Sequence, residues 1–158
     1  MIRFALAGLL LGSVLAAGPA LAASGCDSPQ DLAAVHDTRV RISQQCDCEN
    51  AVSDGSYVRC AATVANDDLS TGLLPRECRR TVLKCAKKST CGRPLGYHPC
   101  CRTNRLGKFK CKITTADRCR SGPGGSHCMS VHKQSCCDAC TGPGTCNSPS
   151  GAFIDPVR

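Results

Sequence analysis

An unbroken apolar segment opens the chain, and shorter periodic segments follow it. Residues 4–17 are apolar or small apart from one Ser, a positive residue precedes them, and a Gly-Pro pair ends the run. Residues 20–22 read Ala-Leu-Ala, which has small residues at the two positions that signal peptidase recognises. The pattern predicts a signal peptide over 1–22, cleaved after Ala22, and therefore a secreted, periplasmic or cell-surface protein.

Two alternatives to this cleavage stay open. An uncleaved segment of about 20 apolar residues could span a bilayer as an anchor. Small residues also precede Cys26, as lipoprotein processing requires, although Ala23 stands where a Leu is usual. Lipidation of Cys26 would leave an odd number of thiols, which needs a special explanation in an exported protein. No second apolar segment follows, so we expect no transmembrane helix in the mature chain.

The start of the mature chain predicts a short helix and then a strand. Ser28 is a helix cap and Pro29 suits the first turn, so a helix is expected that ends near His36. Val40 and Ile42 then alternate with arginines, which indicates a short strand.

Two amphipathic segments predict a helical hairpin. Residues 56–69 place most of their apolar side chains on one face at a period of 3.6 residues, with Asp54 or Ser56 as the cap. Residues 75–89 form a second such segment, with two cysteines on its apolar face. The short link between the two segments favours an antiparallel pair.

The period changes to alternation in the second half of the chain. Phe109, Cys111 and Ile113 alternate with three lysines, and turn residues occupy 104–107. Alternation after such a turn, with residues 101–103 before it, predicts a β-hairpin.

We therefore expect a small disulfide-rich α+β fold, in which a helical hairpin precedes a β-hairpin and a loop-rich cysteine region. A helical part spans 23–95, a strand-and-loop part spans 96–146, and a flexible tail spans 147–158. Glycine-rich loops are expected at 121–125 and 141–145. Bridges between the two parts would make them one domain, and the sequence leaves this open.

Composition makes disulfides the expected source of stability. Leu, Ile, Val and Phe supply only 20 of the 136 residues from 23 to 158, and Trp is absent. Such a chain would ordinarily be disordered, whereas more than ~8–10% Cys in a short exported chain indicates a disulfide scaffold. The even number of 16 cysteines predicts eight bridges and no free thiol. The predicted disulfide cysteines are Cys26, Cys46, Cys48, Cys60, Cys78, Cys85, Cys91, Cys100, Cys101, Cys111, Cys119, Cys128, Cys136, Cys137, Cys140 and Cys146.

Connectivity cannot be derived from the spacing, with one exception. Two pairs of cysteines are adjacent, Cys100-Cys101 and Cys136-Cys137. Adjacent side chains in an extended segment point to opposite sides, so the members of each pair are expected to bond to different elements.

Charge is distributed unevenly along the mature chain. Residues 23–75 contain three basic and eight acidic residues, whereas 76–120 contain fourteen basic and two acidic residues. The basic segment predicts a surface for an anionic partner, such as an envelope component like lipopolysaccharide or an acidic polysaccharide. The alternative is a solvated surface, or one matched by the acidic N-terminal third. The predicted anion-binding residues are Arg76, Arg80, Lys84, Lys87, Lys108, Lys110 and Lys112.

Few aromatic residues accompany these cations, and base stacking needs aromatic side chains. Specific nucleic-acid recognition is therefore not expected. No partner protein is indicated, and neither ligand nor oligomeric state follows from the sequence.

Other chemistry receives less support. The segment 127–140 contains a C-x-x-C spacing and two histidines, which could indicate a redox, zinc or copper protein. In an oxidising compartment, however, cysteines are mostly consumed by disulfides. No G-x-S-x-G turn is present, the even number of cysteines leaves no thiol free as a nucleophile, and no pair of carboxylates has a recognisable catalytic setting. The default expectation is therefore a protein that is not an enzyme and has no cofactor. The second hypothesis is a secreted effector, such as a toxin-like antimicrobial protein or a protease inhibitor. Residues 92–99 would be the loop that contacts its target.

Several cysteine-containing segments resemble a pattern that recurs in uncharacterised cysteine-rich exported bacterial proteins. These segments are 48–50, 54–61, 85–92, 100–104 and 135–140. The resemblance covers most of the mature chain, and it implies bacterial export without any activity, ligand or catalytic residue. Where these proteins tend to have Asn-His before a Gly-x-Tyr-Val segment, this chain has Ser53-Asp54.

Overall fold

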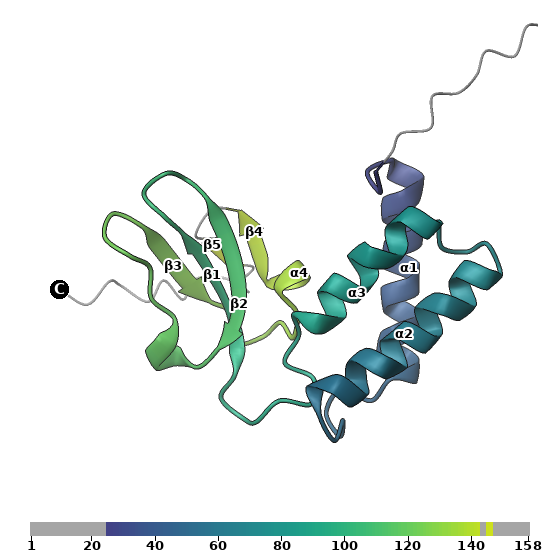
Figure 1. Ribbon diagram of the computed structural model, residues 1–158. Coiled ribbons are helices and arrows are strands. Elements are labelled where there is room, and N and C mark those ends of the chain that lie inside the picture. Colours follow the sequence, from purple (N-terminus) through teal and green to yellow (C-terminus); the bar gives the residue numbers. More distant parts are fainter. Residues whose placement is uncertain (1–24, 143–144, 147–158) are drawn as a thin grey trace, which may run out of the picture.

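The computed structural model describes residues 25–142 and 145–146, so the predicted signal peptide and tail lie outside the described residues. Helices form one side of the molecule, and small antiparallel sheets form the other (Figure 1). The chain passes from the helices to the sheets once, between 88 and 98. The expected small disulfide-rich α+β fold is confirmed.

Helix α1 (Pro29–Gln45) begins as predicted but is much longer. The Ser28 hydroxyl accepts a hydrogen bond from the N–H of Asp31 at 3.1 Å, and Pro29 occupies the first turn. The predicted end near His36 and the strand at 40–42 are both wrong. Val35, Thr38 and Ile42 are buried at helical spacing, whereas Val40 is exposed, so contact with the other helices overrides the short alternation.

Helix α2 (Asp54–Ser70) is capped by Ser53, so the predicted caps Asp54 and Ser56 are wrong. The Ser53 and Ser56 hydroxyls accept each other's backbone N–H groups at 3.1 and 3.0 Å, which is a reciprocal capping box. The Ser pair supplies side-chain acceptors to two N–H groups at the start of the helix, where the acceptors of the preceding helical turn are missing.

The predicted helix over 75–89 is present as a 3-10 turn, η1 (Arg76–Cys78), followed by α3 (Arg79–Lys87). Helices α2 and α3 pack on each other and on α1, so the predicted hairpin is part of a three-helix unit. The apolar core of this unit contains Val35, Ile42, Tyr57, Ala61, Val64, Leu74, Val82 and Ala86. Disulfides Cys26–Cys78, Cys46–Cys60 and Cys48–Cys91 enclose this core.

A buried ion pair joins α1 to α2. Asp68 is 5% exposed, and one oxygen of its carboxylate accepts hydrogen bonds from Nε and Nη2 of Arg41 at 3.0 and 2.7 Å. Burial alone would favour the neutral carboxyl, but hydrogen bonds from Arg41 and the Arg41 charge outweigh it and lower the pKa of Asp68. The sequence pattern assigned no role to this acid, although it lies on the inner face of α2.

The main sheet has three antiparallel strands in the order β2-β1-β3. Strands β1 (His98–Thr103) and β2 (Phe109–Thr114) confirm the predicted hairpin. Strand β3 (Ser126–Met129) was not predicted, because its four residues show no apolar alternation. The 3-10 turn η2 (Ala116–Arg118) lies between β2 and β3.

The last cysteine-rich segment contains α4 (Cys136–Ala139), β4 (Cys140–Gly142) and β5 (Thr145–Cys146). Strands β4 and β5 pair, so the loop predicted at 141–145 is wrong at its described residues. Their cysteines are bonded to β1 and β3 through Cys101–Cys140 and Cys128–Cys146. Covalent anchoring explains why such short strands form without an apolar pattern.

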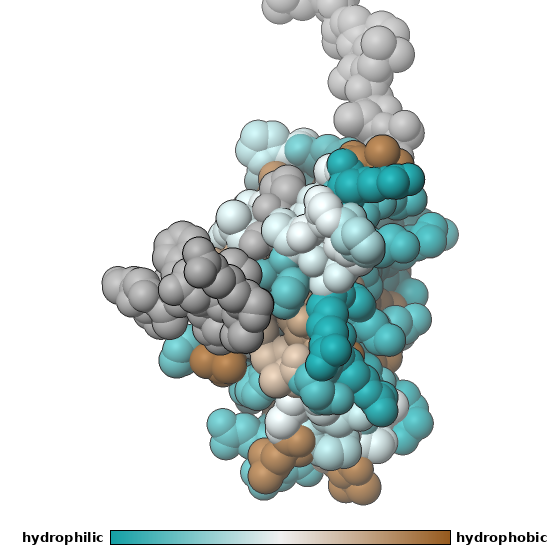
Figure 2. Space-filling view, turned by 90° about the vertical axis from the view of Figure 1, so that its left-hand side faces the viewer, coloured by the Kyte–Doolittle hydropathy of each residue, from teal (hydrophilic) through white to brown (hydrophobic). Residues whose placement is uncertain are grey.

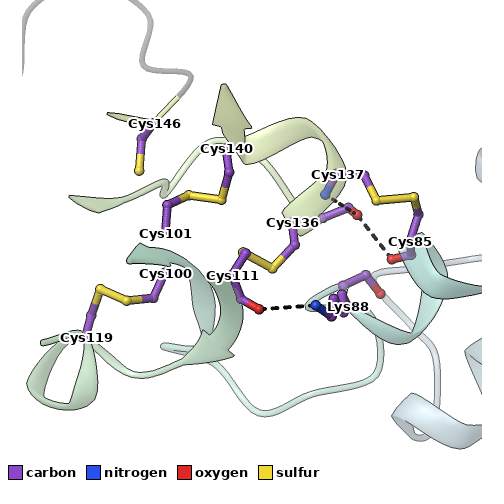
Figure 3. Close-up of a disulfide and its surroundings, with 12 residues drawn as sticks. Cys85, Lys88, Cys100, Cys101, Cys111, Cys119, Cys136, Cys137, Cys140 and Cys146 are labelled. Carbon is purple, nitrogen blue, oxygen red and sulfur yellow. Dashed lines mark hydrogen bonds between the residues drawn. A yellow bond between two sulfur atoms is a disulfide. The ribbon is translucent and has the colours of Figure 1, made fainter. Parts of the chain in front are cut away.

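All sixteen cysteines form eight disulfides, and neither adjacent pair bonds internally. Cys100 bonds to Cys119 and Cys101 to Cys140, whereas Cys136 bonds to Cys111 and Cys137 to Cys85 (Figure 3). As predicted, the partners of each adjacent pair lie in different elements. Cys26 bonds to Cys78, so in this state its thiol is not available for lipidation.

The helical and sheet parts are joined by one disulfide, by backbone hydrogen bonds and by side-chain contacts, which include an ion pair between Arg39 of α1 and Asp138 of α4. Cys85–Cys137 is the disulfide between them. The N–H of Thr90 donates to the carbonyl of Gln134 at 2.8 Å, and the N–H of Cys136 donates to the carbonyl of Lys88 at 2.9 Å. The Lys88 ammonium also reaches the Cys111 carbonyl on β2 at 3.4 Å (Figure 3). The end of α3 is therefore held against the free edge of the sheet.

Candidate anion-binding site

The predicted lysines of β2 lie in a row with side chains from the two neighbouring strands. Lys110 pairs with Arg102 on β1, and Arg102 pairs with His127 on β3. Directly opposed residues of a sheet share one face, as do residues two apart along a strand. We name this surface the cationic sheet face, and it consists of Arg102, Lys108, Lys110, Lys112 and His127.

The segment after β2 packs on the same face. Cys100 lies two residues before Arg102 and bonds to Cys119, which anchors this segment to β1. The Nη1 group of Arg102 donates to the Arg120 carbonyl at 3.3 Å. These contacts fix the central guanidinium and add the exposed Arg120 beside it.

Acidic groups are nearly absent from this region. Residues 96–135 contain eight Lys or Arg and a single acid, Asp117, which pairs with Arg118 at 3.8 Å. Lys108, Lys110 and Lys112 are all exposed, and strands β1, β2 and β3 contain no Asp or Glu. The summed field over the cationic sheet face is therefore positive, which attracts anions. Viewed from the sheet end, the surface is mostly hydrophilic, with isolated hydrophobic residues (Figure 2).

The predicted cations of α3 form a separate group. Arg76, Arg80, Lys84 and Lys87 are all exposed, as expected for one polar stripe. In Figure 1, α3 runs away from the sheet, and its last turn is the end held near β2. At about 1.5 Å per helical residue, Arg76 and Lys87 are separated by roughly 16 Å along the helix axis. The seven predicted residues therefore form two basic groups.

Arg102 and His127 were missing from the predicted set. A turn over 104–108 that pairs Thr103 with Phe109 also pairs Arg102 with Lys110, so the hairpin signal could have identified Arg102. His127 depends on β3, for which the sequence carries no signal.

The acidic N-terminal third does not neutralise the cationic sheet face. Asp68 pairs with Arg41 inside the helical part, and Asp54 pairs at 3.0 Å with Arg93, between α3 and the sheet. Helices α1 and α2, which carry most of these acids, lie on the other side of the molecule from the main sheet (Figure 1). The acidic residues of 23–75 that form these ion pairs therefore do so with Arg41 and Arg93, and not with the lysines of the cationic sheet face.

The segment 127–140 is organised by disulfides. Cys137 and Cys140 of the C-x-x-C spacing bond to Cys85 and Cys101, not to each other. Three sulfurs, those of Cys101, Cys128 and Cys146, lie within 4.8 Å of one another, and each is in a disulfide. While these bridges are intact, the sulfurs are not available as thiolate ligands or redox thiols.

Two hollows lie near this segment. One, of about 550 Å³, is open and is lined by polar residues that include His132, Lys133 and Asp138. The other, of about 110 Å³, lies between the helical and sheet parts, beside Tyr57 and Gln134. Both hollows are lined by basic and neutral residues together with the acidic Asp138, whereas the cationic sheet face contains no acidic residue.

The loop 92–99, which would contact the target if the protein were an effector, is held in place at its first residues. Gly92 packs on the backbone of Ser53, and Arg93 pairs with Asp54. Leu95 at its tip is fully exposed.

In the part of the chain that the structure describes, none of the helices has the length and apolar character needed to cross a bilayer. Eight disulfides fit a protein of an oxidising, extracytoplasmic compartment. The resemblance to cysteine-rich exported bacterial proteins stays a prediction. No family model, no curated protein and no solved structure matches this chain.

Proposed function

We propose that this protein is an exported, disulfide-stapled binding module whose cationic sheet face binds an anionic partner. The proposal includes removal of the signal peptide after Ala22 and a non-enzymatic role. The partner would be an anionic envelope component or an acidic polysaccharide. The observation that carries the proposal is the row of Lys110, Arg102 and His127 across three strands that contain no acid.

The spacing of the cations suits an extended polyanion. Alternate residues of a strand lie about 6.7 Å apart, and neighbouring strands lie about 4.8 Å apart. Lys110 and Lys112 therefore follow one another along the same face of β2, with Lys108 in the turn just before it, and Arg102 lies directly opposite Lys110 on β1. Phosphate, sulfate or carboxylate groups that repeat along a chain could contact several of these cations at once.

The disulfides hold this arrangement in place before a partner binds. Cys100–Cys119 and Cys101–Cys140 both anchor β1, the central strand. A surface that is already ordered loses less conformational entropy on binding than a flexible basic segment would.

Reversal of three charges on the sheet tests the proposal. Lys108→Glu/Lys110→Glu/Lys112→Glu is expected to weaken heparin binding by roughly 100-fold or more at low salt, since each cation near an anionic surface contributes about 1 kcal/mol. Affinity would be measured by titration with heparin, alongside elution from a heparin column in a salt gradient.

Arg76→Glu/Arg80→Glu/Lys84→Glu is the matched control, because it makes the same change in net charge on α3. It is expected to weaken binding by less than about tenfold, through long-range electrostatics alone. Equal losses in the two variants would assign binding to net charge, and no loss in the first would refute the proposed site. Circular dichroism would verify that both variants fold.

A further inference from the structure

The turn between β1 and β2 combines exposed apolar side chains with cations. Leu106 at the tip is 81% exposed, and Phe109 at the start of β2 is 40% exposed. Arg105 and Lys108 flank Leu106 in the sequence, and both are exposed. In Figure 1 this turn projects from the sheet away from the helices. We name residues 104–109 the hairpin tip.

Asn104 fixes the backbone of the hairpin tip. Its side-chain oxygen accepts the N–H groups of Leu106 and Lys108 at 3.0 and 2.8 Å, and its carbonyl accepts the N–H of Gly107 at 2.9 Å. Three consecutive N–H groups therefore have partners inside the turn. Gly107 adopts the left-handed conformation, with φ of 73°, that closes such a turn.

A turn with satisfied N–H groups can enter a poorly hydrated layer at low cost. An unpaired N–H transferred from water to an apolar environment costs several kcal/mol, and here that cost does not arise for the three N–H groups around Leu106. Leu106 is thus presented on a rigid, internally bonded loop.

The chemistry of the hairpin tip distinguishes between anionic partners. An acidic polysaccharide or a nucleic-acid backbone would contact the cations but would leave Leu106 in water. At an anionic bilayer, the leucine would be buried among acyl chains near the headgroups while lysines and arginines contact the phosphates. Exposed Leu106 beside Arg105 and Lys108 therefore favours a lipid surface.

We propose that the hairpin tip inserts Leu106 among the acyl chains just below the headgroups of an anionic phospholipid bilayer, with Arg105, Lys108 and Lys110 on the phosphates. This inference rests on the proposed function, and it names the partner of the cationic sheet face.

Two serine substitutions at opposite ends of β1 test the insertion. Leu106→Ser is expected to weaken binding to phosphatidylglycerol/phosphatidylcholine vesicles by about tenfold, as expected for the loss of one buried leucine side chain. Leu95→Ser is the matched control, because Leu95 is also highly exposed but precedes β1, and a change of less than about twofold is expected. Heparin affinity should be unchanged in both variants.

The absence of Trp from the chain provides a second, spectroscopic readout. Leu106→Trp should show a blue-shifted emission on anionic vesicles and no shift with heparin, whereas Leu95→Trp should show no shift with either.

Two results would overturn the inference. Unchanged vesicle binding by Leu106→Ser, together with loss of both vesicle and heparin binding in the β2 charge-reversal variant, would leave the proposed function standing with a soluble polyanion as partner. Retention of both kinds of binding by the charge-reversal variant would overturn the proposed function as well.

Discussion

Reduction of the eight disulfides is expected to unfold the protein completely under otherwise native conditions. The bridges join residues 14 to 52 positions apart, and in the chain-entropy model each such loop contributes about 3–4 kcal/mol. These contributions overlap, yet together they exceed the total stability of about 5–15 kcal/mol that is typical of a small domain. The apolar core is too small to replace them, since most of its members are Val, Ala and Cys. Far-UV circular dichroism and proteolysis, with and without a phosphine reductant, would measure the loss.

A double variant distinguishes the effect of reducing all eight disulfides from the effect of losing one of them. Cys85→Ser/Cys137→Ser removes the disulfide between the helical and sheet parts but leaves three bridges in one part and four in the other. We expect this variant to stay folded, with a lower thermal midpoint, because hydrogen bonds such as Thr90 to Gln134 still join the parts. Helical ellipticity that survives full reduction would contradict this view of the fold.

Gly92→Ala is expected to lower the free energy of unfolding by about 3 kcal/mol or more, which is large for a single methyl group. A Cβ at this position would lie 2.2 Å from the carbonyl carbon of Ser53 and 2.6 Å from the nitrogen of Asp54. Both are backbone atoms of the capped start of α2, which cannot move without breaking the cap. The left-handed φ of 69° adds about 1–2 kcal/mol for a residue with a side chain. Thermal unfolding should shift by on the order of 10 °C.

Gly72→Ala is the control for the backbone conformation alone. Gly72 has a similar φ of 74°, but nothing lies within 4 Å of a Cβ there. The expected cost is only about 1–2 kcal/mol. Equal destabilisation by the two substitutions would mean that the close approach of Gly92 to α2 is not required by the fold.

Local signals predicted those elements that local chemistry specifies. Ser28 and Pro29 define the start of α1 because a cap and a first-turn proline act within three residues. The β1–β2 hairpin followed from the alternation in β2 and from a turn that Asn104 and Gly107 close by themselves. The end of α1 was missed, because burial of Ile42 depends on helices that follow much later in the sequence.

The candidate site was only partly predictable for the same reason. Lys110 and Lys112 alternate along β2, and Lys108 continues this spacing just before the strand, so their common face is visible in the sequence. His127 joins them only because β3 pairs with β1, and disulfides bind these two strands to the β4–β5 pair through Cys101–Cys140 and Cys128–Cys146. Sixteen cysteines allow a very large number of connectivities, so this contact could not be derived from spacing.

Mapping of the contact surface by NMR tests most directly the claim that the cationic sheet face is the binding site. Uniformly ¹⁵N-labelled, oxidised protein would be titrated with a heparin-derived tetrasaccharide at low salt, and amide shifts would be followed. We predict the largest shifts at residues 102–112 and 118–127, with little change in α1 and α2. Shifts concentrated on the helices, or a complete absence of shifts at millimolar ligand, would contradict the proposed site.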